Sequence, residues 1–314
     1  MGARSGGGEQ GPEVIFHADD FGMTVRQSAE MLSLAGVLSG DGALSSISIM
    51  VGSPAARESA RLIAGAEGRL RVSLHLNLVE GPCTADPAEI PLLVDDTGHF
   101  RLGFAGLLAR SAGPGASELE RQIGIEIAAQ IERFLELVPG AAHHLRIDSH
   151  QHFHLIPAVF RSLMGAVRQR GLSIEYLRIP AEPLAPFLRA PRSLLRVPPV
   201  NWVKSAVLNL LWLRCRRIPG AREVPTAVFF GIGFSGRMTR ENVSALLPGF
   251  KDVARRRGLP LEVLFHPTGL RADERPLAPA LDGFVAFYRS PLRAAEAEAL
   301  RSLGGDHHED ASRR

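Results

Sequence analysis

Two adjacent carboxylates stand near the start of the chain, in the sequence "FHADDFG" (16–22). Asp19 and Asp20 follow a short apolar run and precede a glycine. Neighbouring carboxylates repel each other, and burying either one without a partner is costly. Groups elsewhere in the chain must therefore compensate this pair, and the nature of those groups indicates the chemistry.

Several of the 11 histidines lie in apolar segments close to acidic residues. His75 lies in "LHLNL", and the segment "IDSHQHFH" (147–154) holds Asp148 and His150. Because side chains alternate along a strand, Asp148 and His150 are expected to point to the same face. The roles of three further histidines stay open: His17, His152 and His154.

One carboxylate and two imidazoles, from Asp20, His75 and His150, would bind a divalent metal and leave positions open for water and substrate. This donor set suits zinc. A cation on Asp20 would neutralise one charge of the pair and leave Asp19 ionised as a base. A metal-dependent phosphoesterase is an alternative, but the sequence reveals no second carboxylate cluster for a two-metal site.

Strand-like apolar runs alternate with helical stretches along the chain. The predicted strands cover 13–18, 44–50, 70–78, 143–151, 174–180, 227–234 and 261–267. The predicted helices cover 25–38, 54–65, 118–138, 157–170, 240–257 and 290–303. Strands that alternate with helices predict a mainly parallel sheet. Seven such strands favour a single-domain β/α barrel-like fold, a distorted or incomplete TIM-type barrel, and a doubly wound open sheet is the alternative.

Polar residues suited to catalysis stand where most of these strands end. They are Asp19, Asp20, His75, Asn77, Asp148, His150, Arg178 and His266. The carboxyl ends of parallel strands converge on one face, where active sites are built. These residues are therefore expected to share one cavity.

The bulk composition excludes several classes of protein. Lys and Arg (36) nearly balance Asp and Glu (33), and no basic stripe is interleaved with aromatic residues, so no nucleic-acid partner is predicted. Cys83 and Cys215 lie far apart, which argues against a disulfide scaffold and fits a reducing compartment such as the cytoplasm. No apolar run reaches the roughly 18 residues that span a bilayer.

The two ends of the chain are predicted to be disordered. Residues 1–12 are rich in glycine and have no apolar region of a secretory signal. Residues 304–314 are polar. The folded domain is therefore expected over 13–303.

Both tryptophans of the chain lie in the segment "NWVKSAVLNLLWLRCRR" (201–217), which is otherwise largely apolar and ends in arginines. Such a segment can lie on a membrane surface, so a peripheral membrane contact is one expectation. Packing against the barrel or against a homodimer partner are the alternatives.

Seven pieces of the sequence, in order, resemble the YdjC-like carbohydrate deacetylases of the ChbG/HpnK type. They are "ADDFG" (18–22), "SSISIMVGSPAA" (45–56), "LHLNLVEGP" (74–82), "IDSHQHFH" (147–154), "LRIP" (177–180), "GIGFSGRM" (231–238) and "FHP" (265–267). The resemblance implies a barrel-like fold over 13–303 and one divalent metal ion, magnesium or zinc. It also implies removal of the acetyl group from an N-acetylated amino sugar, in an N-acetylglucosamine-containing oligosaccharide or glycolipid.

The same resemblance implies roles for individual residues. Asp20, His75 and His150 would be the metal ligands, Asp19 the catalytic base and His266 the acid. Three further residues, Arg178, Asp148 and Asn77, would contact the substrate or support these groups. Arg178 would hold a sugar oxygen or orient Asp19. Asp148 would fix the tautomer of a histidine.

Two positions depart from the family pattern. His17 replaces a common asparagine, and Thr268 replaces a usual glycine. The resemblance leaves a lipid-linked, hopanoid-type substrate open, and also a non-catalytic sugar-binding module on the same fold.

Overall fold

The computed structural model describes residues 11–66, 68–275, 277 and 282–312. Within them seven strands form one sheet: β1 (Val14–Phe21), β2 (Ser46–Ile49), β3 (Arg71–Leu76), β4 (Leu145–Ser149), β5 (Ile174–Leu177), β6 (Val228–Phe230) and β7 (Leu261–Phe265). Their spatial order is β5-β4-β3-β2-β1-β7-β6, and every neighbouring pair is parallel.

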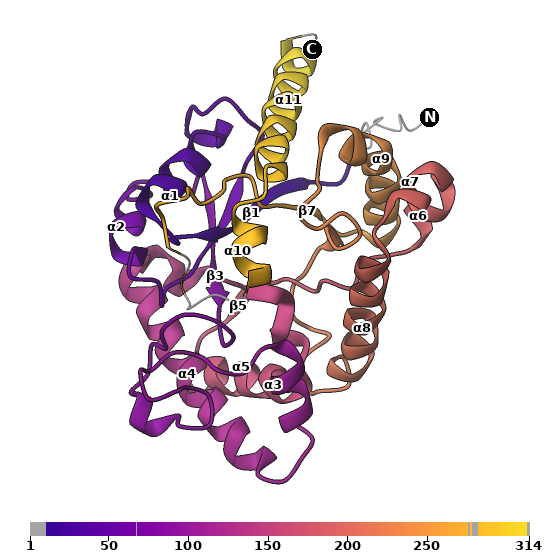
Figure 1. The fold of residues 1–314 in the computed structure, drawn as a ribbon. Helices are drawn as coiled ribbons and strands as arrows, with labels where there is room; N and C mark the ends of the chain where they lie inside the picture. The colour runs from indigo at the N-terminus through magenta and orange to yellow at the C-terminus, as the bar shows by residue number, and fades with distance from the viewer. Residues whose placement is uncertain (1–10, 67, 276, 278–281, 313–314) are drawn as a thin grey trace, which may run out of the picture.

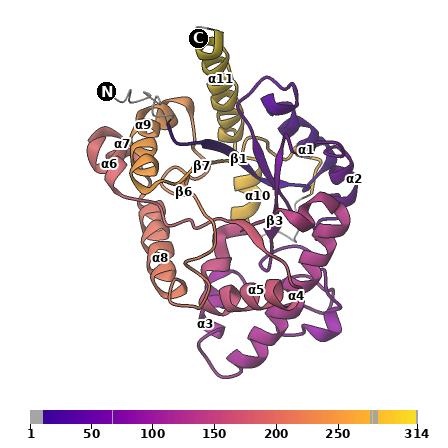
Figure 2. The ribbon, with the colours of Figure 1, turned by 180° about the vertical axis from the view of Figure 1, so that it is seen from behind.

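The sheet curls into an incomplete barrel with helices around it, as Figures 1 and 2 show from opposite sides. Its two edge strands, β5 and β6, are not paired with each other in the sheet. One backbone hydrogen bond bridges this opening: the Leu177 N–H donates to the Pro225 carbonyl oxygen at 2.9 Å. The predicted distorted β/α barrel is thus confirmed, and the doubly wound alternative is wrong.

The interior of the barrel is polar. Strand side chains alternate between the two faces, and the polar members of each strand contact one another: His17 bonds to Ser46, Ser48 to Asp19 and His75, and His75 to Asp148. The residues between them are apolar and buried: Phe16, Ala18, Ile47, Ile49, Leu74, Leu76 and Ile147. The apolar core therefore lies mostly between the sheet and its outer helices.

The helices follow the strands on the outside of the barrel. They are α1 (Val25–Leu32), α2 (Ala56–Arg61), α3 (Phe104–Arg110), α4 (Ala116–Leu137), α5 (Pro157–Gln169), α6 (Ala185–Arg189), α7 (Pro191–Arg196), α8 (Pro199–Cys215), α9 (Arg240–Arg257), α10 (Asp282–Tyr288) and α11 (Leu292–Ser312). Four short 3-10 helices add to these: η1 (Gly36–Leu38), η2 (Pro87–Glu89), η3 (Pro139–His143) and η4 (His150–Leu155). The sequence predicted α4, α5 and α9 closely, but it missed α3, α6, α7 and α10.

The carboxyl end of the chain differs from the expectation of a disordered tail over 304–314. Helix α11 continues to Ser312. Gly304 lies so close to the backbone of Gly42 that a β-carbon there would come within 2.8 Å of it. A glycine at this position allows α11 to pack closely against the loop at Gly42. Residues 1–10 and 313–314 of the predicted disordered ends lie outside the described residues.

None of the helices in the described ranges is long and apolar enough to cross a bilayer.

Gly22, directly after β1, generates a prediction about stability. Its φ is +95°, a value that residues with a β-carbon rarely adopt, and a β-carbon there would lie 3.3 Å from the Ile49 Cγ1 atom. Gly22→Ala should lower the free energy of unfolding by about 1–2 kcal/mol, measured by urea denaturation. Gly124→Ala is the matched control. Gly124 lies inside α4 with open space around it, so this change should stabilise the protein by roughly 0.5–1 kcal/mol. Equal stability of both variants would contradict the claim that the backbone conformation at position 22 requires glycine.

Candidate active site

An irregularity at the end of β1 brings both adjacent carboxylates into the barrel. The pairing of β1 with β2 shifts register between Ala18 and Phe21, and Asp20 has a φ of 67°. In a regular strand two consecutive side chains would point to opposite faces, and a bulge removes this alternation locally. Asp19 and Asp20 are both buried, and each has its own set of partners.

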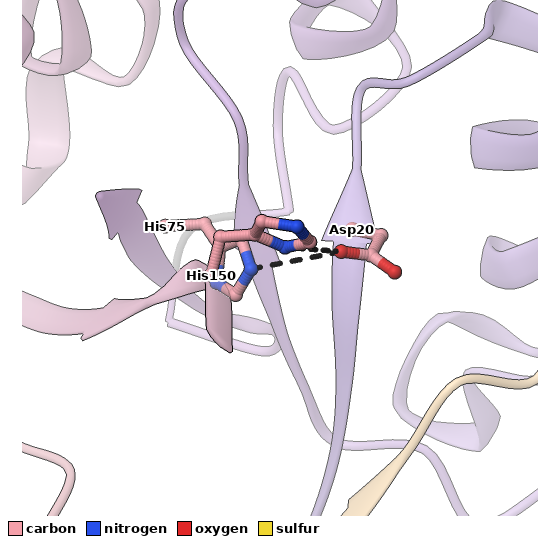
Figure 3. A group of neighbouring side chains, drawn as sticks. All are labelled: Asp20, His75 and His150. Carbon is pink, nitrogen blue, oxygen red and sulfur yellow. Dashed lines mark ion pairs between the residues drawn. The ribbon is translucent and has the colours of Figure 1, made fainter. Parts of the chain in front are cut away.

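Asp20, His75 and His150 converge as the sequence predicted. The Oδ1 atom of Asp20 lies 3.2 Å from His150 Nδ1 and 3.6 Å from His75 Nε2, and both imidazoles point to it in Figure 3. One ligand atom from each residue lies within 4.8 Å of the others. Asp20 Oδ1 and His75 Nε2 are buried and have no hydrogen-bond partner. Such atoms need compensation, so the three residues fit a divalent metal ion.

A carboxylate holds the far nitrogen of each imidazole. His75 Nδ1 lies 2.6 Å from Asp148 Oδ1, and His150 Nε2 lies 2.9 Å from Glu80 Oε1. This carboxylate–histidine arrangement orients imidazoles toward a metal and fixes the tautomer that can bind it. Asp148 thus has the position expected for it. Glu80 was missed, although it lies within the quoted segment "LHLNLVEGP".

Asn77 shapes the turn that carries Glu80. Its side-chain oxygen accepts hydrogen bonds from the backbone N–H groups of Val79 and Glu80, and its amide donates to the Glu80 carbonyl oxygen. The Tyr288 hydroxyl donates to the Glu80 carboxylate and lies 3.2 Å from His150 Nε2. Asn77 is therefore linked to His150 through the Glu80 turn.

The surrounding carboxylates favour protonated imidazoles. Burial alone would lower the pKa of His75, but Asp19 and Asp148 outweigh it and raise the pKa to about 9. Burial likewise disfavours the charged form of His150, yet Glu80 and other carboxylate contacts raise its pKa to about 10. The site thus attracts positive charge, which protons or a metal cation can provide.

Asp19 is held by a buried arginine. Arg178 is fully buried and donates to both oxygens of Asp19, at 2.8 and 2.9 Å. Burial would raise the pKa of Asp19, but Arg178 and nearby histidines hold it well below its usual value. Asp19 is therefore ionised at neutral pH. Of the two expected roles for Arg178, its position matches the orientation of Asp19.

His266 lies beside Asp19, with 4.0 Å between His266 Nε2 and Asp19 Oδ2. Its backbone N–H donates to the Glu296 carboxylate at 2.5 Å, and its ring packs edge-on against Phe287. Burial lowers the pKa of His266 to about 4, despite the nearby aspartates. The His266 side chain is thus neutral at pH 7.

His17 belongs to a second group that the sequence did not reveal. His17 Nε2 lies 3.2 Å from Asp19 Oδ1 and 3.3 Å from Asp148 Oδ2, and its Nδ1 lies 2.8 Å from Ser46 Oγ. His17, Asp19 and Asp148 form a second cluster with metal-like spacing. The Arg178 guanidinium contacts both aspartates, and this fixed positive charge disfavours a cation there.

The segment after β4 corrects another prediction. The strand was expected to continue to residue 151, but it ends at Ser149, and Gln151 and His152 have φ values of 53° and 58°. His150 therefore reaches Asp20 from a 3-10 turn and not through strand alternation. His154 is a structural residue in this turn, because its Nε2 bonds to the Arg178 carbonyl oxygen at 2.8 Å.

The comparisons with known proteins agree with this fold. A solved structure from Enterococcus faecalis, of a protein named for a proposed role in cellobiose-phosphate cleavage, has a TM-score of 0.61 over 96% of this chain and 95% of that one. The two sequences are 17% identical, so the likeness shows the fold alone.

Two curated relatives are enzymes by name. A carbohydrate deacetylase of Danio rerio is 29% identical over 54% of this chain and 50% of its own length. A chitooligosaccharide deacetylase of Escherichia fergusonii is 31% identical over 52% of this chain and 58% of its own length. This chain thus matches only about half the length of these relatives. The family model described as "YdjC-like protein" matches residues 13–303, and the chain therefore belongs to the YdjC-like family.

Proposed function

We propose that this protein is a metal-dependent hydrolase that removes the acetyl group from an N-acetylated amino sugar. The observation that carries the proposal is the convergence of Asp20, His75 and His150, with two unpartnered buried ligand atoms, beside the ionised Asp19. The relatives named as carbohydrate and chitooligosaccharide deacetylases support the substrate class.

A divalent cation held by the three ligands would polarise the acetamide carbonyl group and make a water molecule more acidic. Two imidazoles and one carboxylate favour zinc, since magnesium prefers oxygen ligands. Metal-free protein reloaded with zinc, magnesium or manganese would identify the active ion through the rate of acetate release.

Asp19 accepts a proton from the attacking water in this proposal. Arg178 keeps the carboxylate ionised and fixes its direction through two hydrogen bonds. Its low pKa makes it a weak base, so the water must be acidified for the transfer to occur.

His266 delivers a proton to the leaving nitrogen. An amine leaves poorly without that proton, so the reaction requires an acid. Because burial keeps the imidazole neutral in the resting protein, His266 must first gain a proton. Asp19, 4.0 Å away, is its nearest source once it has taken one from water. The two residues would thus pass one proton from water to the amine.

A non-catalytic sugar-binding module is the second candidate for this fold. Acetate release from N-acetylglucosamine oligomers, in the presence of a divalent metal, distinguishes it from the enzyme. A lipid-linked amino sugar should be tested in the same assay.

Asp19→Asn should retain the metal but lose at least about a hundredfold in turnover, because the amide cannot accept the proton. His75→Ala should lose metal and turnover together. Acetate release and metal content by mass spectrometry measure both effects. Asp96→Asn, an exposed change of the same kind, should behave as the wild type. Wild-type turnover in Asp19→Asn would reject the base assignment.

Metal binding should release protons at pH 7, because the pKa of His75 is raised to about 9 and that of His150 to about 10. A cation must displace those protons, so metal affinity should rise about tenfold per pH unit for each proton released. Calorimetry with zinc in two buffers of different ionisation enthalpy measures the number of protons. Equal heats in both buffers would contradict the prediction.

Glu80→Gln should weaken metal affinity by about 10–100-fold, because the His150 imidazole loses its carboxylate partner. Competition with a chromogenic chelator measures the affinity. Glu89→Gln is the matched control, since Glu89 is exposed on η2 in the same connection. A metal affinity equal to that of the control would show that Glu80 does not orient His150 for metal binding.

A further inference from the structure

Charge is strongly segregated along the chain. Residues 183–222 contain eight basic and no acidic residues, whereas the remainder has 28 basic and 33 acidic residues. The formal charge of +3 therefore conceals one strongly cationic segment in an otherwise acidic protein. All eight basic side chains are exposed: Arg189, Arg192, Arg196, Lys204, Arg214, Arg216, Arg217 and Arg222.

The same segment exposes most of the large hydrophobic side chains that reach solvent in the described part of the chain. Seven of nine lie on α6, α7, α8 and their connections: Leu184, Leu188, Leu195, Val200, Val203, Leu210 and Leu213. Leu195 is 84% exposed and Val203 63%. The three helices lie on one side of the molecule in both views (Figures 1 and 2). We call these seven side chains and the eight cations the basic apolar face.

Helix α8 shows that this exposure is systematic. Its buried side is formed by residues three or four positions apart, including Asn201, Ser205 and Leu208. The 3.6-residue helical period places Val203 and Leu210 on the opposite side, toward solvent. A helix at a protein surface normally turns polar residues outward. The outer side of α8 is therefore suited to a non-aqueous partner.

The tryptophans of α8 do not form this face. Trp202 packs edge-on against Phe187, and Trp212 packs against Phe160. Both rings are only partly exposed and are held by the protein. The face consequently offers aliphatic side chains and cations, without a free aromatic surface on which nucleic-acid bases could stack.

We propose that the basic apolar face binds the surface of an anionic lipid bilayer. A bilayer surface offers an apolar layer for the leucines and valines, and negative headgroups for the arginines. Two of the eight cations, Arg189 and Arg196, pair with Asp252 and Glu241 of α9, but the face as a whole stays cationic. A second copy of the chain would bring two such cationic surfaces together, which like-charge repulsion disfavours. The proposal concerns this surface alone and does not depend on the reaction proposed above.

The face is tied to the edge of the barrel that carries the candidate active site. The Glu182 carboxylate, just before α6, accepts hydrogen bonds from the backbone N–H groups of Gly231 and Gly233 in the loop that follows β6. Asn201 of α8 donates to the Gly233 carbonyl oxygen at 3.0 Å. That loop lies at the carboxyl end of the strands, the edge that also carries His150 and His266. Membrane binding would thus hold this edge near the lipid.

Sedimentation of the full chain with vesicles tests the proposal. The wild type should bind vesicles of phosphatidylcholine with phosphatidylglycerol at least about tenfold more tightly than vesicles of phosphatidylcholine alone. Salt at ~1 M, where the Debye length is about 3 Å, should weaken that binding. Leu210→Asp and the double variant Arg214→Glu/Arg217→Glu should each weaken it at least about tenfold.

Matched changes elsewhere on the surface are the controls. Leu62→Asp and Arg57→Glu/Arg61→Glu alter exposed residues on and beside α2, and they should bind vesicles as the wild type does. Circular dichroism checks the fold of each variant. Failure of the wild type to bind at low salt, equal binding to neutral vesicles, or wild-type binding by both face variants would overturn the proposal. So would a solution dimer that Leu210→Asp dissociates, because the face would then be a protein interface.

Discussion

The buried guanidinium of Arg178 is the group on which the interior of this barrel depends. It contacts Asp19, Asp148 and Glu262, with nitrogen–oxygen distances from 2.6 to 3.3 Å. These carboxylates come from β1, β4 and β7, so one side chain after β5 joins strands from different parts of the sheet. Three buried carboxylates without this cation would repel one another, and removal of one partner from such a network is strongly destabilising. The incomplete barrel is thus held across its interior where β5 and β6 do not pair.

This arrangement assigns different environments to the two adjacent aspartates. Both oxygens of Asp19 are engaged by Arg178, so this carboxylate stays ionised without a metal. Asp20 is bound by Arg293 through Oδ2 only, at 3.2 Å, and its Oδ1 faces the two imidazoles. A cation is therefore best placed on Asp20. The bulge in β1 makes the separation possible, because it brings both side chains inside while directing them to different partners.

The sequence predicted most of the fold and the cluster of Asp20, His75 and His150, since both follow from patterns that are local. Asp20, His75 and His150 could be identified because each stands at the end of a strand-like run. The polar interior could also have been found, from the alternating polar pairs His17 and Asp19, Ser46 and Ser48. These pairs lie within largely apolar runs, but their period of two is the signal of one polar strand face.

Other parts of the site had no local signal. Arg293 reaches Asp20 from 273 positions away, and its place depends on how α11 packs against the barrel. Glu80 becomes a partner of His150 only through the turn at Asn77. The positive φ of Asp20 is equally hidden, because it is uncommon even for aspartate, which adopts it more readily than most residues with a β-carbon, and nothing in the local sequence requires it. The positions of Arg293 and Glu80 and the backbone conformation of Asp20 thus depend on tertiary packing, which the sequence pattern does not reveal.

The connection between β5 and β6 relates the open barrel to the basic apolar face. This connection holds α6, α7 and α8, and it occupies the side of the sheet where no strand pair closes the barrel. Its inner side packs against the barrel, where Asn201 donates a hydrogen bond to the loop after β6. Its outer side carries aliphatic residues and cations with no acidic residue among them. A helix that is apolar on nearly all sides is hard to explain in water alone. With protein on one side and a lipid surface on the other, as we propose, each side of α8 has a matching environment.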